Sequence, residues 1–172
     1  MLSSSTTDLW AVIADEATRE SALWAEALRP EPVREQELVF SPLSQERFAL
    51  GLETIYEGYL LHYGRPRVFE PADRHTSLLL GDYLYAHGLV RIAAWENVEA
   101  VADLAALISL CAQLRADSSP GDGAAWAATA ALLGHGPLFE THDPAALEAA
   151  ACEVAGAEAV EHALALHGRR VR

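Results

Sequence analysis

Hydrophobic residues recur three and four positions apart along most of the chain, which is the period of an amphipathic helix. The pattern predicts helices over residues 9–29, 43–63, 73–92, 97–116, 124–133 and 143–167. Helix 43–63 is expected to stop at Gly64-Arg65-Pro66, because glycine suits the position after a helix and proline cannot continue it. About six helices without a strand pattern predict an all-α fold, a compact bundle in one domain over residues 1–172.

Predicted helix 73–92 is apolar on nearly every face. Such a pattern is typical of a helix buried on both sides, either in the middle of a bundle or across a dimer interface. Gly81 and Gly88 lie within this helix, where each costs about 1 kcal/mol relative to alanine. Close approach of another backbone would offset that cost. We therefore expect this helix to be tightly packed and the protein to be a homodimer.

Polar residues and proline mark where the other helices begin and end. Asn97 and Asp143-Pro144 are expected to cap the helices that follow them, and Ser41-Pro42 to begin helix 43–63. Residues 135–142 are expected to be irregular. The clearest break is 117–123, a run of Ser, Pro, Gly and Asp, which predicts a mobile loop and a candidate hinge.

Composition excludes several classes of function. The formal net charge is −13 and all 12 basic residues are arginine, so the surface should repel nucleic acid. Cys111 and Cys152 lie in apolar patterns and are expected to be reduced thiols. The chain shows no leader pattern and no uncharged apolar run of about 18 residues, so we expect a soluble, cytoplasmic protein with no membrane span. P-loop, nucleotide-binding Gly-x-Gly-x-x-Gly and Gly-x-Ser-x-Gly motifs are absent.

Two motifs nevertheless point to a family. The predicted turn reads Tyr63-Gly64-Arg65-Pro66-Arg67, and the following helix contains Leu80-Gly81-Asp82-Tyr83-Leu84. Their order and spacing, followed by Cys111-Ala112-Gln113, resemble the first half of a trans-isoprenyl diphosphate synthase. The resemblance covers residues 53–113 and implies a truncated, degenerate member of the polyprenyl synthetase family, with the all-α isoprenoid synthase fold.

The resemblance implies a set of site residues. Counting back from Gly64 places Glu53 and Glu57 on the first and last carboxylates of the family's Asp-rich motif, which binds Mg²⁺ and a diphosphate. Four residues apart on a helix, the two side chains point the same way. The remaining candidates for a remnant diphosphate pocket are His62, Arg65, Arg67 and Asp82. An alternative remains that Glu53 and Glu57 are solvated charges on a helix surface.

Several residues that the family's chemistry needs are replaced. Thr54 stands where the motif has its second aspartate, His62 and Tyr63 stand where the turn has paired arginines, and lysine is absent. Ionising an allylic diphosphate requires cations to neutralise the leaving group. The sequence therefore predicts a non-catalytic protein that acts as an oligomeric partner or regulatory subunit, or that binds an apolar or prenyl ligand.

Two alternatives stay open. The chain could be the small subunit of a heteromeric prenyl diphosphate synthase, contributing Glu53, Glu57 and Arg65 to a site shared with a full-length partner. In the other alternative it is a plain helical bundle of unknown function, and the likeness is accidental.

Overall fold

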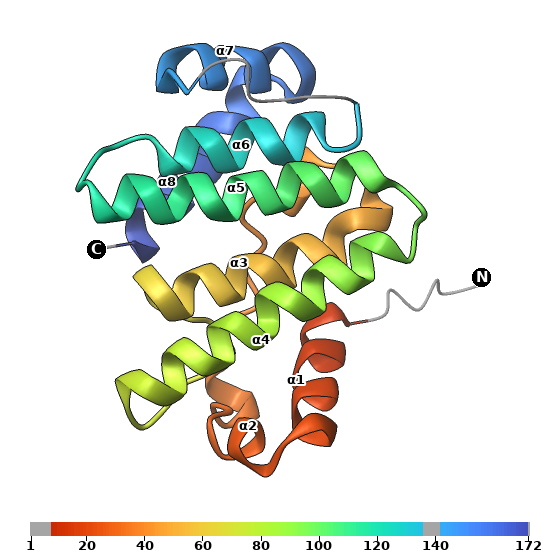
Figure 1. Ribbon diagram of the computed structural model, residues 1–172, viewed down its shortest axis with the longest axis vertical. Coiled ribbons are helices and arrows are strands. Elements are labelled where there is room, and N and C mark those ends of the chain that lie inside the picture. The colour runs from red at the N-terminus through yellow and green to blue at the C-terminus, as the bar shows by residue number, and fades with distance from the viewer. Residues whose placement is uncertain (1–7, 136–141, 172) are drawn as a thin grey trace.

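The computed structural model describes residues 8–135 and 142–171, which form a bundle of α-helices (Figure 1). The helices are α1 (Leu9–Glu20), α2 (Ala22–Glu26), α3 (Ala49–Tyr63), α4 (Arg74–Ala93), α5 (Val98–Ala116), α6 (Asp122–Leu132), α7 (Pro144–Ala155) and α8 (Ala157–Arg170). Short 3-10 turns precede α3: η1 (Glu31–Val33), η2 (Ser41–Leu43) and η3 (Glu46–Phe48). The described residues contain no strand, only isolated bridges. The predicted all-α class is confirmed.

Helix α3 occupies the middle of the bundle. Figure 1 shows α3 between α5 and α4, with α1 and α2 at one end of the molecule and α7 at the other. Every residue of α3 from Gly51 to Leu61 is buried. Two of these residues are glutamates, so the burial of α3 follows from how its polar groups are paired and not from its hydrophobic pattern alone.

Helix α4 buries one face within this chain, so of the two positions predicted for it, the one in the middle of the bundle is wrong. Its buried residues are Leu80, Gly81, Leu84, Gly88 and Ile92. On the opposite face, the side chains of Leu79 and Val90 are 57% and 65% exposed. The hydrophobic pattern could not indicate that α3 is buried more completely than α4, because it does not show which polar side chains find buried partners. A dimer interface on the exposed face of α4 stays a prediction.

Glycines set the close contact between α3 and α4, as predicted for Gly81 and Gly88. A Cβ atom on Gly58 of α3 would lie 2.8 Å from the carbonyl oxygen of Gly81 in α4. One on Gly88 would lie 3.0 Å from the carbonyl oxygen of Gly51. Real Cβ atoms do not tolerate the shorter of these distances. The two helices therefore approach at two places where neither carries a side chain, seven residues apart on both.

Two of the predicted helix starts are confirmed. The side chain of Asn97 accepts a hydrogen bond from the Ala100 amide, and that of Asp143 accepts one from the Ala146 amide. Each of these bonds gives a partner to one amide in the first turn of its helix. Of the two cysteines, Cys111 is buried and Cys152 partly buried, and both are free thiols as expected. Most of the segment predicted to be irregular, 135–142, lies outside the described residues.

Three predicted helices are shorter or divided. The first ends at Glu20, where extended Ser21 caps α2 through its hydroxyl. The last divides into α7 and α8 at Gly156, whose φ of 90° is incompatible with a continuous helix. Helix α3 begins at Ala49 and not at residue 43, because η2 and η3 take up the residues between. No helix in the described ranges has the length and apolarity that crossing a bilayer requires.

Candidate functional site

Glu53 and Glu57 come together around Arg67, in what we call the Arg67 cluster. Helix α3 places the two carboxylates one turn apart, and Arg67 folds back from the segment after α3. Nη1 of Arg67 lies 2.5 Å from Oε2 of Glu53, and Nε lies 3.0 Å from Oε2 of Glu57. All three side chains are buried, with at most 1% of any of them exposed. The cluster is thus a dry ion network in the core.

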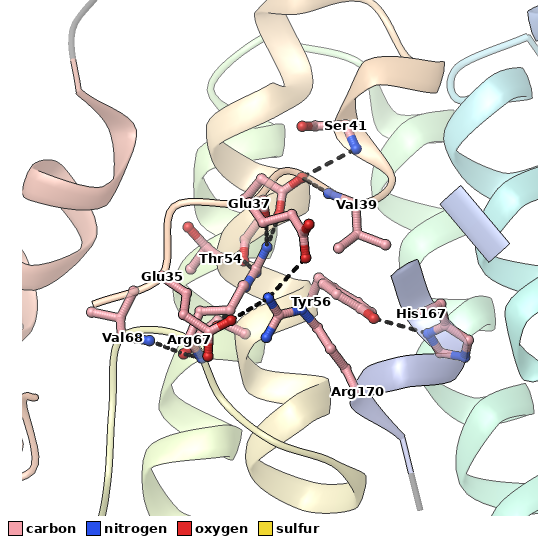
Figure 2. A network of polar contacts seen from close by, with 12 residues as sticks. Glu35, Glu37, Val39, Ser41, Thr54, Tyr56, Arg67, Val68, His167 and Arg170 are labelled. Atoms are coloured by element: carbon pink, nitrogen blue, oxygen red, sulfur yellow. Dashed lines mark hydrogen bonds and ion pairs between the residues drawn. The ribbon is translucent and has the colours of Figure 1, made fainter. Parts of the chain in front are cut away.

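Backbone amides satisfy the other carboxylate oxygens. Oε1 of Glu53 accepts hydrogen bonds from the amides of Val39 (3.3 Å) and Ser41 (3.2 Å). Oε1 of Glu57 accepts from the amides of Arg67 and Val68, both at 2.8 Å. Figure 2 shows these segments converging beside α3. Each carboxylate therefore gives one oxygen to the guanidinium and the other to two amides, which attaches both flanking segments to α3 by charge-assisted bonds.

Arg67 is held on every side. Its guanidinium carbon lies 4.4 Å from the centre of the Trp10 ring and 5.0 Å from that of Tyr56, and Nη1 also donates to the carbonyl of Glu37. Burial works against the charged form of Arg67, but the two glutamates outweigh burial and raise its pKa. The cation at this position is therefore the protein's own arginine.

The residues of the Arg67 cluster do not fit a Mg²⁺ ion. Such an ion needs near-octahedral oxygen ligands and usually keeps several waters. Glu53 and Glu57 have no exposed surface for water, and the positive charge of Arg67 occupies the space between their carboxylates. In the described ranges, no group of three or more His, Cys, Asp or Glu side chains is arranged to hold a metal. The alternative that both glutamates are solvated surface charges is wrong, since both are fully buried.

The other predicted site residues lie elsewhere. Arg65 is exposed, and its Nη2 donates to the carbonyl oxygen of Arg169 in α8 at 2.6 Å. His62 and Asp82 face each other across α3 and α4, with Nε2 and Oδ1 3.0 Å apart. Burial lowers the pKa of His62 against the opposing effect of Asp82, whose side chain is 70% exposed. The structure therefore brings Glu53, Glu57 and Arg67 together and separates them from the other three candidates.

A second polar network, which sequence reasoning missed, lies further along α3. It joins Tyr59 of α3, Arg115 of α5, Asp122 of α6 and His167 of α8, and we call it the Asp122 cluster. The Tyr59 hydroxyl donates to Oδ2 of Asp122 and accepts from Nε (3.0 Å) and Nη2 (2.8 Å) of Arg115. Arg115 also donates to Asp122, and Nε2 of His167 lies 3.3 Å from the same carboxylate oxygen.

The charges within the Asp122 cluster support one another. Burial disfavours the ionised form of Asp122, but the hydrogen bonds from His167 and Tyr59 and the charge of Arg115 outweigh it and lower the pKa of the carboxyl. Burial, together with the bond to Asp122 and its charge, raises the pKa of the Tyr59 hydroxyl. The cluster therefore holds an ionised carboxylate and a neutral phenol at neutral pH.

A surface hollow of about 760 Å³ opens beside the Asp122 cluster. Arg115 and Asp122 line it, together with Tyr63, Ser119 and Val171. The side chains of Asp122 and Arg115 are 15% and 21% exposed, so both reach solvent. The hollow thus offers hydrogen-bonding groups whose charges already compensate each other. The only sequence signal for this hollow was the break predicted at 117–123. Spacing along the chain could not indicate the rest, because residues of four helices meet here from distant parts of the chain.

No protein-family model matches this chain, and neither the curated proteins nor the solved structures searched contain a match. The resemblance to the polyprenyl synthetase family stays a prediction.

Proposed function

We propose that this chain is a non-catalytic helical protein that acts as an oligomeric partner and does not transfer prenyl groups by itself. The observation that carries the proposal is the engagement of Glu53 and Glu57. Both carboxylates bind Arg67 and backbone amides in the core. A metal-bound diphosphate would have to displace that arginine and unfold the segments it holds.

The outer face of α4 is the surface through which we expect association. Leu79, Ala86, Val90 and Ala93 recur at helical spacing and are all exposed, and Asp82 is the charged residue among them. An apolar stripe on the solvent side of a surface helix is typical of an interaction surface. Because one helix can pack against its own copy about a twofold axis, we propose a homodimer formed by two α4 helices.

The proposed lack of prenyl transfer is tested by an activity assay. The purified protein is incubated with Mg²⁺ and with allylic and homoallylic diphosphates, and the products are analysed by chromatography. We expect no elongated product. Chain elongation by the protein alone would overturn the proposal. Elongation only after a full-length synthase is added, and lost on Glu53→Ala in a variant that still folds, would favour the small-subunit alternative.

The association surface is tested by light scattering. We expect twice the 18.6 kDa chain mass for the wild type and the mass of one chain for Val90→Glu. Val154→Glu on α7 is the matched control, since the valine side chain there is 55% exposed and lies away from α4. A monomeric wild type, or equal loss of mass in both variants, would contradict an α4 interface.

A further inference from the structure

A second hollow lies between the start of α3 and the end of α4. It has a volume of about 440 Å³ and is lined by Arg47, Leu50, Gly51, Arg91, Ala94 and Trp95. Small-molecule sites commonly have volumes of about 300–1,000 Å³. We call this hollow the Arg47 pocket. Its surface is mainly apolar, and the charged groups that reach it are two guanidinium groups.

The walls of the Arg47 pocket are fixed by tight packing. Gly51 contributes no side chain, since a Cβ atom there would lie 2.5 Å from Cδ1 of Ile92, which α4 buries behind it. Trp95 follows directly after α4, where its amide bonds to the carbonyl of Ile92 at 3.1 Å. The Trp95 side chain is nevertheless 51% exposed. A large aromatic side chain thus lines the pocket without being buried by this chain.

The two arginines of the pocket differ in their partners. Arg91 is fixed by Glu16 of α1 and by the hydroxyl of Thr54, which accepts from Nη1 at 2.8 Å. The guanidinium carbon of Arg47 lies 4.6 Å from the centre of the Phe48 ring. Within the described residues, no carboxylate lies at ion-pair distance from Arg47. An arginine without a carboxylate partner is a locally positive point in a chain whose net charge is −13.

We propose that the Arg47 pocket binds a small organic anion with an aliphatic body. The head group pairs with Arg47, with the charge of Arg91 nearby, and the body covers Leu50, Ala94 and the Trp95 ring. Burial of each added methylene should raise affinity by about fourfold. Arginine suits a carboxylate head group, because its planar guanidinium can donate two parallel hydrogen bonds.

Titration calorimetry with octanoate, below its micelle-forming concentration, tests the proposal on the full chain. We expect saturable binding of one octanoate per chain, roughly fifteenfold tighter than hexanoate because two methylenes are added. Octylammonium has the same body and the opposite charge, and it should bind at least tenfold more weakly. Equal binding of octanoate and octylammonium, or no saturable binding of octanoate, would overturn the proposal.

Two variants locate the site. Arg47→Gln should weaken octanoate binding at least tenfold, and Trp95→Ala should weaken octanoate and octanol alike. Arg19→Gln is the matched control, because it removes the same charge from an exposed position on α1. Thermal unfolding should show that Arg47→Gln remains folded. If Arg19→Gln weakens binding as much as Arg47→Gln, the effect is one of net charge and the proposed pocket is wrong.

Discussion

The Arg67 cluster and the Asp122 cluster are both built on α3, but they differ in their access to water. In the Arg67 cluster at most 1% of any side chain is exposed. In the Asp122 cluster, Asp122 and Arg115 are 15% and 21% exposed and line a hollow. A buried ion has lost its hydration and depends on its partners, whereas a partly exposed one can exchange a partner for water. The first network therefore holds the fold together, and the second has groups that a ligand can reach.

The largest loss of stability is expected when the positive charge of Arg67 is removed from the Arg67 cluster. Arg67→Met keeps much of the side chain's volume but leaves Glu53 and Glu57 buried without a counter-ion. Breaking a buried ion pair in this way costs about 3–5 kcal/mol, so we expect that loss in the free energy of unfolding. Urea unfolding followed by circular dichroism measures it. Arg65→Met, an exposed arginine two residues away, should cost no more than about 0.5 kcal/mol. Similar losses in both variants would show that the Arg67 cluster is not the structural one.

A glycine substitution on α3 separates packing from charge. Alanine at Gly58 would bring a Cβ atom to 2.8 Å from the Gly81 carbonyl, and backbone cannot move aside cheaply. We expect Gly58→Ala to lower the free energy of unfolding by about 2–3 kcal/mol, in the range of overpacked cores. Gly168→Ala in α8 meets no atom within 4 Å and should instead gain about 0.5–1 kcal/mol from helix propensity. A gain in both variants would mean that α3 and α4 are not in close contact.

The sequence predicted the fold class better than it predicted how deeply each helix is buried. Hydrophobic spacing found most of the helices, and Gly81 with Gly88 correctly indicated a close backbone contact. Burial of α3 was missed, because a pattern counts Glu53 and Glu57 as polar and cannot see that Arg67 folds back onto them. The split at Gly156 was missed as well, since one glycine inside a helical pattern is compatible with a continuous helix.

The candidate sites show the same limit. The family resemblance placed Glu53, Glu57 and Arg67 among the site candidates, but it did not indicate that the arginine would take the place expected for a metal. Tyr59, Asp122 and His167 come from three helices far apart in the chain. Their meeting depends on how α6 and α8 pack against α3, and no local signal carries that information.

A loss of stability of intermediate size is expected when the Asp122 cluster is changed. Asp122→Asn keeps the shape but removes the charge that Arg115 and His167 face, and charged hydrogen bonds of this kind contribute about 1.5–3 kcal/mol when buried. Because the cluster is partly exposed, we expect a loss near the lower end, about 1.5 kcal/mol, at pH 7. Urea unfolding of both proteins measures this difference. A loss as large as that of Arg67→Met would mean that the two networks do not differ in kind.

The same variant predicts a pH dependence. The pKa of Asp122 is lowered in the folded protein, so the ionised carboxylate stabilises the fold at any pH above its unfolded value of about 3.9. That contribution is lost as the pH falls further, through the folded pKa. The difference between wild type and Asp122→Asn should therefore shrink as the pH falls below about 4. A difference that grows over this acidic range would contradict the assigned direction of the shift.

The smallest change in stability is expected for the pair of His62 and Asp82, which is the most exposed of the three polar contacts compared. Asp82 is 70% exposed, and an ion pair with such a partner contributes about 0–1 kcal/mol. Asp82→Asn should therefore change the free energy of unfolding by less than about 0.5 kcal/mol. It should still act on the histidine, because Asp82 opposes the burial that lowers the pKa of His62. We expect that pKa to fall further in Asp82→Asn, measured by NMR titration of the ring, with His75 in the same spectra as an internal reference. An unchanged or higher pKa of His62 would show that the carboxylate does not reach the ring in solution.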